Sequence, residues 1–488
     1  MVPARGLGRP CAIASAVALL LVACGQQSPS PLQPTASDLG DRLAALVSVT
    51  AIRADLSTLQ RIADANGQTR ADGTPGYAAS ADFVDKTLRD LGYQVQLDTL
   101  TVPLFTEGGI GRLEIPGGPT FQTGRDFKAM LFSGSGDISA RVVPIGFERN
   151  ADPTTFIDLP SGKGCSQGEL PTSVRGTILL VQPGPCFRRA QVLSAQRAGA
   201  LAIVVSYPEW EPGFVLRPTL IQPDGITIPA LGTTKEMGLA LADAASAGTS
   251  VHLRVQTSLV ERSVSSVIAE TPAGDPSHVV MLGGHLDSAL DSPGINDNGS
   301  GTMTLVEVAR RLATLDAPRL KVRFAFWAGE ELGFWGSRHY VMGLDEAQRQ
   351  TIVAYLNLDM LGSPNGARIV YVDRGAPSGS EQISAIFTNY FDHVKLMHEA
   401  LDLGGGSDHF SFAQADIPTG GLFSGANMVK TDDEVTRFGG KAGDLMDACY
   451  HRACDRTENV DAGLLQQMAR AVAFAAGTLA SGDVIVQR

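Results

Sequence analysis

The sequence predicts a mainly parallel α/β sheet flanked by helices and interrupted by a β-rich insert, on the basis of three observations. Residues 41–102 have the pattern of helix, helix and strand, residues 103–258 contain many short β-like runs, and strands and helices alternate from about residue 259. Such alternation is typical of a parallel sheet. The 488 residues also exceed one ordinary domain. We therefore expect an α/β domain formed by residues 41–102 and 259–488, with residues 103–258 as a separate inserted module.

The N-terminus has the features of an export signal. Arg5 and Arg9 precede an apolar run, residues 12–23, which is too short to span a bilayer as a mature helix. The run ends in LVAC, which resembles the bacterial lipobox and implies cleavage before Cys24 and lipidation of that cysteine. Residues 1–23 are thus the predicted signal peptide. A plain signal peptide cut elsewhere, or an uncleaved anchor, are the alternatives.

The segment that follows, residues 24–40, is rich in Gln, Ser and Pro and is predicted to be a flexible tether. We expect a lipoprotein of the cell envelope that faces the periplasm or the cell exterior and meets the membrane only through Cys24. The net charge of −12 argues against nucleic acid or an anionic membrane surface as a partner. We expect a monomer, although the sequence leaves the oligomeric state open.

Four cysteines remain once Cys11 leaves with the signal and Cys24 carries lipid. An even number of cysteines in an oxidising compartment suggests disulfides, and free thiols are the alternative. Proximity along the chain suggests two pairs, Cys165–Cys186 and Cys449–Cys454.

The elements of each region can be placed by their apolar spacing. Helical spacing recurs around Leu56 and again around Val84, and Gly92 ends the second helix before an alternating strand, 93–102. In the insert we expect strands at 140–145, 177–181 and 202–206 and a helix at 190–198; its single histidine, His252, has no clustered carboxylates beside it. In the last region we expect strands at 279–282, 322–327 and 353–358 and a helix at 303–312.

Each of the three strands of the last region is followed by a histidine or an acidic residue. GGHLDS carries His285, AGEE carries Glu330 and Glu331, and NLDM carries Asp359, while the loop NDNGSG can bring Asp297 to the same edge. Seven of the eight histidines also lie between residues 278 and 451. Ligands bind at the carboxyl edge of open α/β sheets.

One imidazole and several carboxylates at one edge would repel each other without a cation. Mixed imidazole and carboxylate ligands suit zinc, and a carboxylate can bridge two metal ions. Of the adjacent glutamates, one can bind metal while the other acts as a general base. The alternative is that the acidic residues are helix caps or solvated turn residues.

The motifs resemble a known family. GGHLDS, GINDNGSG, WAGEELGFWGS, LNLDMLGSPN and CYHRACD occur in the order found in the secreted bacterial two-zinc leucine aminopeptidases. The resemblance covers about 259–480 and the N-terminal stretch RADGTPGYAASADFVDKTLRDLGYQV. The insert resembles a protease-associated domain, as in vacuolar aminopeptidases. The resemblance implies a zinc-dependent exopeptidase-like fold.

The resemblance also implies a role for each site residue. Asp297 would bridge two zinc ions. His285 and Asp359 would complete the ligand set of one ion, and Glu331 and His451 would complete that of the other. The remaining roles are Glu330 as general base, Asp287 as the carboxylate that orients His285, Tyr450 as the donor to the oxyanion, and the Cys449–Cys454 bridge as the brace of the loop that presents His451.

The function implied is a zinc-dependent aminopeptidase that hydrolyses the N-terminal peptide bond of peptides with a free N-terminus, through a metal-activated water. The alternatives are a glutaminyl cyclase-like transferase with one zinc ion, a carboxypeptidase of the same superfamily, and a non-enzymatic binding protein. One departure concerns substrate binding: relatives often have Arg before the SDH motif, where this chain has Gly406.

Other candidates have simpler interpretations. The resemblance makes His409 a structural or pocket-lining residue, and His339 is expected on a helix surface. Trp327 and Trp335 are expected to pack in the core. We expect solvated side chains at His278, His393 and His398, and a solvated loop at 432–434, where calcium is an alternative that we do not predict.

Overall fold

The structure is a computed structural model, and it describes residues 38–150, 162–207 and 215–488. The predicted signal peptide and Cys24 lie outside the described residues. The helices are α1 Asp38–Leu46, α2 Val49–Ala65, α3 Pro75–Asp90, α4 Arg188–Ala198, α5 Lys235–Ser246, α6 Gly301–Leu312, α7 Glu330–Gly333, α8 Trp335–Gly343, α9 Glu346–Thr351, α10 Ser380–His393, α11 His409–Ala413, α12 Asp432–Phe438 and α13 Ala462–Ala480. None of these helices is both long and apolar enough to cross a membrane.

The main sheet has eight strands, and its four inner strands are parallel. The strands are β1 Gln94–Glu107, β10 Thr257–Glu270, β11 Asp275–His285, β12 Leu320–Trp327, β13 Ile352–Leu358, β14 Ile369–Tyr371, β15 Glu399–Leu401 and β16 Thr419–Phe423. Their order is β1-β10-β12-β11-β13-β16-β14-β15, with β12, β11, β13 and β16 parallel to their neighbours in this group. The predicted mainly parallel α/β fold is confirmed.

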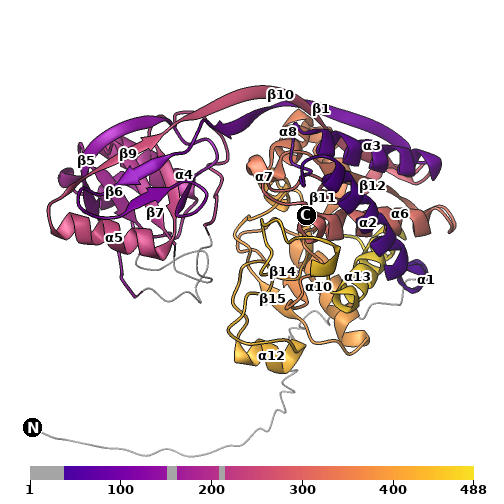
Figure 1. The fold of residues 1–488 in the computed structure, drawn as a ribbon. Helices are drawn as coiled ribbons and strands as arrows, with labels where there is room; N and C mark the ends of the chain where they lie inside the picture. Colours follow the sequence, from indigo (N-terminus) through magenta and orange to yellow (C-terminus); the bar gives the residue numbers. More distant parts are fainter. Residues whose placement is uncertain (1–37, 151–161, 208–214) are drawn as a thin grey trace, which may run out of the picture. The chain divides into compact units, whose positions relative to one another are not determined.

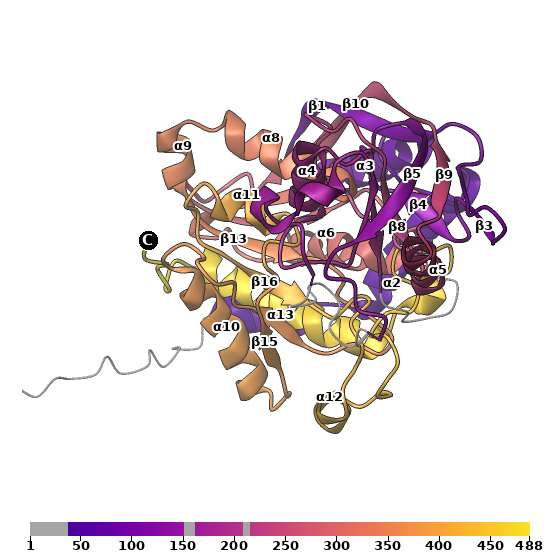
Figure 2. The same cartoon turned by 90° about the vertical axis from the view of Figure 1, so that its left-hand side faces the viewer.

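Helices cover both faces of this sheet. One face packs on α2, α3, α6, α10 and α13 through a large apolar core. The other face packs on α8 and α11 around the fully buried Trp327. Helices α10 and α13 lie side by side in Figure 2. Leu282 faces the first core and Met281 the second, as the alternation of side chains along a strand requires.

Two long strands lead to and from the insert. β1 and β10 pair antiparallel over their whole length, from Gln94 opposite Glu270 to Glu107 opposite Thr257 (Figure 1). The strand predicted for 93–102 therefore continues past the predicted boundary at 103. Thr99 and Ser265 hydroxyls are 2.8 Å apart across this pair.

The insert has its own eight-stranded sheet and its own core. Its strands are β2 Arg112–Glu114, β3 Thr120–Gln122, β4 Phe127–Ala129, β5 Gly136–Pro144, β6 Ile178–Val181, β7 Ala202–Ser206, β8 Ala230–Thr233 and β9 Ser250–Val255. Their order is β3-β2-β9-β5-β6-β7-β8-β4, and α4 and α5 pack against them. The disulfide Cys165–Cys186 lies in this module, as predicted.

Several local predictions were wrong. The N-terminal part has three helices rather than two, because α1 begins at Asp38 inside the predicted tether. Residues 432–434 are not a loop but the first turn of α12, where Thr431 caps the helix and Glu434 is buried. The physical reason is a capping box: the Thr431 hydroxyl accepts the Glu434 N–H, and the Glu434 carboxylate accepts the Thr431 N–H.

Candidate metal centre

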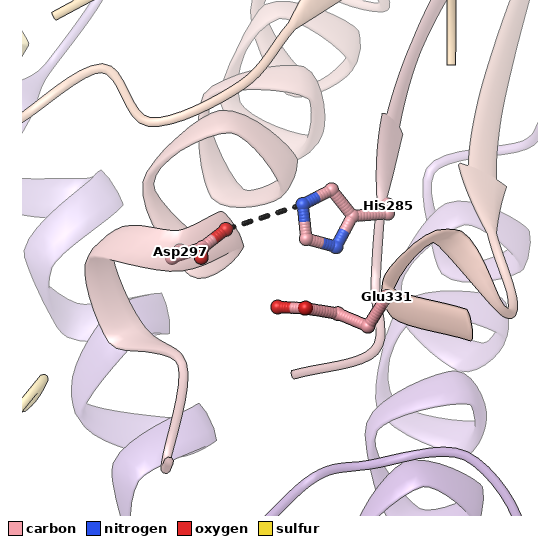
Figure 3. A group of neighbouring side chains, drawn as sticks. All are labelled: His285, Asp297 and Glu331. Atoms are coloured by element: carbon pink, nitrogen blue, oxygen red, sulfur yellow. Dashed lines mark ion pairs between the residues drawn. The ribbon is translucent and has the colours of Figure 1, made fainter. Parts of the chain in front are cut away.

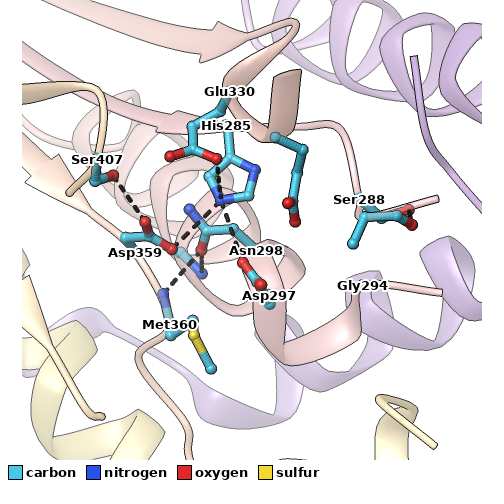
Figure 4. Close-up of polar contacts among 12 residues, drawn as sticks. His285, Ser288, Gly294, Asp297, Asn298, Glu330, Asp359, Met360 and Ser407 are labelled. Carbon is cyan, nitrogen blue, oxygen red and sulfur yellow. Dashed lines mark hydrogen bonds and ion pairs between the residues drawn. The ribbon is translucent and has the colours of Figure 1, made fainter. Parts of the chain in front are cut away.

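The order of three neighbouring strands brings the predicted site residues to one edge. His285 is the last residue of β11, Asp359 follows β13 directly, and Glu330 and Glu331 begin α7 just after β12. The strand register aligns these ends, since His285 is paired with Trp327 and Gly283 with Asn357. Figure 4 shows the Glu330, His285, Asp359 and Asp297 side chains pointing toward one another.

Asp297 lies between the two predicted histidines. Its Oδ1 is 3.2 Å from Nε2 of His285, and its Oδ2 is 3.2 Å from Nε2 of His451. The same nitrogen of His285 is 3.4 Å from Oδ1 of Asp359, and that of His451 is 3.1 Å from Oε2 of Glu331. The five predicted ligands therefore form two sets that share one carboxylate.

Three of these residues converge most closely. His285, Asp297 and Glu331 each offer a ligand atom, and these atoms lie within 4.8 Å of one another (Figure 3). Oε1 of Glu331 and Oδ1 of Asp359 are buried without a hydrogen-bond partner. Buried carboxylate oxygens without partners are costly, so this arrangement suits a cation among them.

The electrostatics of the centre reflect the crowding of carboxylates. Burial raises the pKa of Glu330 well above its ordinary value, and Asp359, Asp408 and Glu331 add to this, while His285 opposes it. Burial disfavours the charged form of His451, but Glu331 and Asp297 outweigh burial and raise its pKa to about 10. A cation among these groups would favour their deprotonated forms, since metal ligands must lose their protons to bind.

Asp287 lies behind His285 and also contacts the turn that carries the glutamate pair. Its carboxylate accepts the backbone N–H groups of Glu330 and Glu331 at 3.3 and 3.1 Å. Its Oδ1 lies 3.6 Å from Nδ1 of His285, whereas the backbone oxygen of Asp287 lies 3.1 Å from that nitrogen. The main contacts of this carboxylate therefore fix the turn that carries the glutamate pair.

Tyr450 and His451 lie on the predicted disulfide loop, Cys449–Cys454. Their rings stack with centroids 3.8 Å apart. His451 has a φ of 57°, which is uncommon for a residue other than glycine. Burial raises the pKa of Tyr450 well above its ordinary value, so its hydroxyl keeps its proton and can donate a hydrogen bond.

Some residues that hold the centre together were not predicted from the sequence. The Asp455 carboxylate accepts the N–H groups of Asn296 and Asp297, and the Asn298 side chain bonds both Leu358 O and Met360 N. The motif NDNGSG contained the asparagines, but their partners are distant in sequence.

Arg70 was also missed. Its buried guanidinium donates to the backbone oxygens of Leu286, Pro293 and Gly294, and so fixes the loop between His285 and Asp297. Burial lowers the pKa of Arg70 to about 10. An isolated arginine gave no signal for this role, although it begins the RADG stretch.

The SDH motif lies beside the centre. Ser407 donates to Oδ2 of Asp359 at 2.7 Å. His409 is buried and its Nε2 is 2.6 Å from Oδ2 of Asp373. It is paired with that carboxylate and lies outside the group of converging ligand atoms.

The remaining histidines and tryptophans differ in their surroundings. His339 is half-exposed on α8, as expected, and Trp327 is fully buried. His278 is exposed and pairs with Asp275. His398 is not simply solvated, because it packs on Phe391 and pairs with Asp392. His393 is exposed and Trp335 packs partly buried against the main core.

Two family models match parts of this chain. Residues 266–476 match the model of peptidase family M28, and residues 143–241 match that of the PA domain. An aminopeptidase of Pseudomonas aeruginosa is 34% identical over 442 residues, which cover 88% of this chain and 81% of that protein. The chain belongs to peptidase family M28.

Other relatives of this M28 peptidase have a similar layout. A probable lipoprotein aminopeptidase, LpqL, of Mycobacterium tuberculosis is 36% identical over 492 residues, which cover 96% of this chain and 93% of that protein. The aminopeptidase of Aneurinibacillus sp. strain AM-1 has the same fold, with a TM-score of 0.71 at 21% identity, over 92% of this chain and 98% of that chain. Residues 266–476 are therefore assigned to the M28 peptidase and residues 143–241 to the PA domain.

Proposed function

We propose that this M28 peptidase is an aminopeptidase with two zinc ions per chain. The observation that carries the proposal is the position of Asp297, whose two carboxylate oxygens face two different imidazoles. Such a carboxylate is suited to bridge a metal pair. His285 and Asp359 would complete one ion, and Glu331 and His451 the other.

The donor set fits zinc better than calcium or magnesium. Two imidazole nitrogens contribute to it, whereas calcium and magnesium sites are made of oxygen ligands. The unpartnered oxygens of Glu331 and Asp359 supply the negative charge that two cations need. We propose no calcium site.

The residues around this pair have distinct roles. Bound zinc ions lower the pKa of water and polarise a carbonyl group. Glu330 would take a proton from the attacking water and return it to the leaving amine, since it lies at the centre with a raised pKa. Asp287 would hold Glu330 in place through its backbone N–H, and Tyr450 would donate to the developing oxyanion.

The proposal can be tested with the zinc-loaded protein and leucine-containing peptides. We expect hydrolysis of leucine amide and of free peptides from the N-terminus, loss of activity with a chelator, and recovery on addition of zinc. N-acetylation should abolish cleavage, because the free amine is part of the recognised group. Cleavage of a blocked peptide would instead indicate a carboxypeptidase, and cyclisation of N-terminal glutamine without hydrolysis would indicate a cyclase.

We also propose that the protein is a monomeric lipoprotein anchored to the cell envelope through Cys24. The support is the LVAC motif, together with a relative named a probable lipoprotein aminopeptidase. Cys24→Ser should abolish lipid attachment and move the protein from the membrane fraction to the soluble fraction, with activity retained. Equal membrane association of the Cys24→Ser and parent proteins would refute the anchor.

A further inference from the structure

A cavity of about 500 Å³ opens beside one end of the candidate metal centre. Glu331 and His451 line it, but His285, Asp359 and Glu330 do not. Its opposite wall belongs to the insert and includes Leu131, Leu216 and Arg217. The cavity therefore joins one half of the centre to the insert.

Three contacts hold the insert against the catalytic part near this cavity. Lys128 Nζ is 2.9 Å from Oδ2 of Asp291, and the Thr219 hydroxyl donates to the backbone oxygen of Leu332 at 2.8 Å. Leu332 follows Glu331 directly in α7. The indole N–H of Trp335 donates to the backbone oxygen of Ile221 at 3.1 Å. The insert thus contacts α7, which begins with the glutamate pair, and α8, which follows it.

The position of the cavity sets the direction of a bound peptide. At the far end of the centre, Oδ1 of Asp359 and both carboxylate oxygens of Asp408 are buried without hydrogen-bond partners. Asp408 also interacts electrostatically with Glu330 and Asp359. A cationic α-amine bound at that end would give these oxygens a donor. The Asp72 carboxylate in the cavity wall also has buried oxygens without hydrogen-bond partners, but it interacts with Asp287 instead. The chain beyond the scissile bond must then run past Glu331 and His451 into the cavity.

The walls favour an apolar side chain. The cations of the cavity are already neutralised, since Lys128 pairs with Asp291 and Arg217 with Glu107. An anionic side chain would therefore have to break one of these pairs to gain a cationic partner. The apolar lining comes from both parts of the chain: Leu104, Leu131, Val215, Leu216, Leu290 and Leu332.

We propose that this cavity binds the residue just after the scissile bond, that it prefers a large apolar side chain there, and that the insert determines this preference. The inference rests on the proposed aminopeptidase function and deepens it. The preferred substrates are then peptides whose second residue is leucine-like or aromatic.

The test compares kcat/KM for Leu-Leu, Leu-Phe, Leu-Gly, Leu-Lys and leucine amide with the zinc-loaded full protein. We expect Leu-Leu to exceed Leu-Gly by about tenfold, because a buried apolar side chain contributes this much to binding. Leu216→Ala, in the insert wall, should lower the Leu-Leu to Leu-Gly ratio by about fivefold. Leu290→Ala, whose side chain is half-exposed, tests the opposite wall with little risk to folding.

The matched control is Leu201→Ala, an exposed leucine of the insert that does not line the cavity. This variant should keep the parent ratio. Suppose that the protein hydrolyses leucine amide but cleaves the dipeptides without selectivity for their second residue, or prefers Leu-Lys. Either result would overturn this inference and leave the proposed function standing. A change in selectivity among alanine, leucine and phenylalanine amides in Leu216→Ala would assign the cavity to the N-terminal residue instead. Failure to hydrolyse leucine amide would overturn the proposed function, and this inference with it.

Discussion

The carboxylate of Asp455 accepts the backbone N–H of Asp297 at 3.0 Å. Asp455 directly follows Cys454 of the disulfide loop that carries His451, so one carboxylate connects that loop to the proposed bridging residue. The N–H of Asn296 donates to the same carboxylate at 2.8 Å. The relative positions of Asp297 and His451 therefore depend on Asp455. The Asp455 side chain contacts the backbone of Asp297 and not the Asp297 carboxylate proposed to bind metal.

Asp455→Ala should weaken metal binding. Loss of the acceptor frees the Asp297 backbone, and residues that orient metal ligands are worth about 10–100-fold in affinity. Competition with a fluorescent zinc chelator measures the change. Asp444→Ala removes an exposed aspartate of the same region and serves as the control. Parent-like zinc affinity in Asp455→Ala would contradict this role.

Glu330→Gln should leave the metal content unchanged and reduce kcat by about 10²–10⁴-fold. The amide keeps the shape of the side chain, and the backbone bond to Asp287 is unaffected, but the amide cannot accept the proton of water. Metal analysis and leucine amide kinetics on one preparation give both quantities. Near-parent kcat would remove Glu330 from the role of base.

His451→Ala should leave one zinc ion per chain. It deletes the imidazole that faces both Asp297 and Glu331 and leaves the His285 set intact. Elemental analysis after equilibration with zinc counts the ions. His339→Ala removes a half-exposed histidine of α8 whose ring pairs with Asp98, and it should keep the parent stoichiometry. Two ions in His451→Ala would refute the assignment.

Much of the fold was predictable because its signals are local. The β7 strand was predicted with the observed bounds, 202–206, since it is a short apolar run between turn signals. The convergence of His285, Glu331 and Asp359 was also predictable, because parallel strands with polar residues at their carboxyl ends meet at one edge.

The parts that could not be predicted depend on contacts between distant segments. Nothing near Arg70 in sequence indicates that its partners are carbonyl groups more than 200 positions away. The cavity beside His451 needs the insert to lie against the 286–294 loop, a relation carried by the Lys128–Asp291 pair. Helix α1 is only nine residues long and packs mainly on α13, at the other end of the chain.

Arg70→Met should destabilise the protein and disturb the metal centre together. It keeps the apolar stem but leaves the carbonyl groups of Leu286, Pro293 and Gly294 without their donor. Each buried group that loses its partner costs about 1–3 kcal/mol, so we expect a loss of at least about 3 kcal/mol in unfolding free energy. Urea unfolding measures it. Arg53→Met, at an exposed position of α2, should change little; an equal effect would show that Arg70 has no special role.

Tyr93→Phe should change how stability depends on alkaline pH. The Tyr93 hydroxyl donates to the backbone oxygen of Ala309 at 2.8 Å, and burial raises the pKa of Tyr93 above its ordinary value. Below pH ~10 the phenol is neutral in both folded and unfolded chains, so the bond contributes about 1 kcal/mol. Above pH ~10 the unfolded chain loses the proton first, so this contribution falls as pH rises toward the folded pKa.

The parent should therefore be more stable than Tyr93→Phe at pH 7 and lose that advantage by about pH 11, where ionisation of the unfolded phenol is worth about 1.4 kcal/mol. Urea unfolding of both proteins at several pH values gives the difference directly, and other tyrosines cancel because both proteins contain them. A difference that stays constant from pH 7 to pH 11 would mean that Tyr93 ionises equally in the folded and unfolded chains, which its burial beside Phe324 opposes.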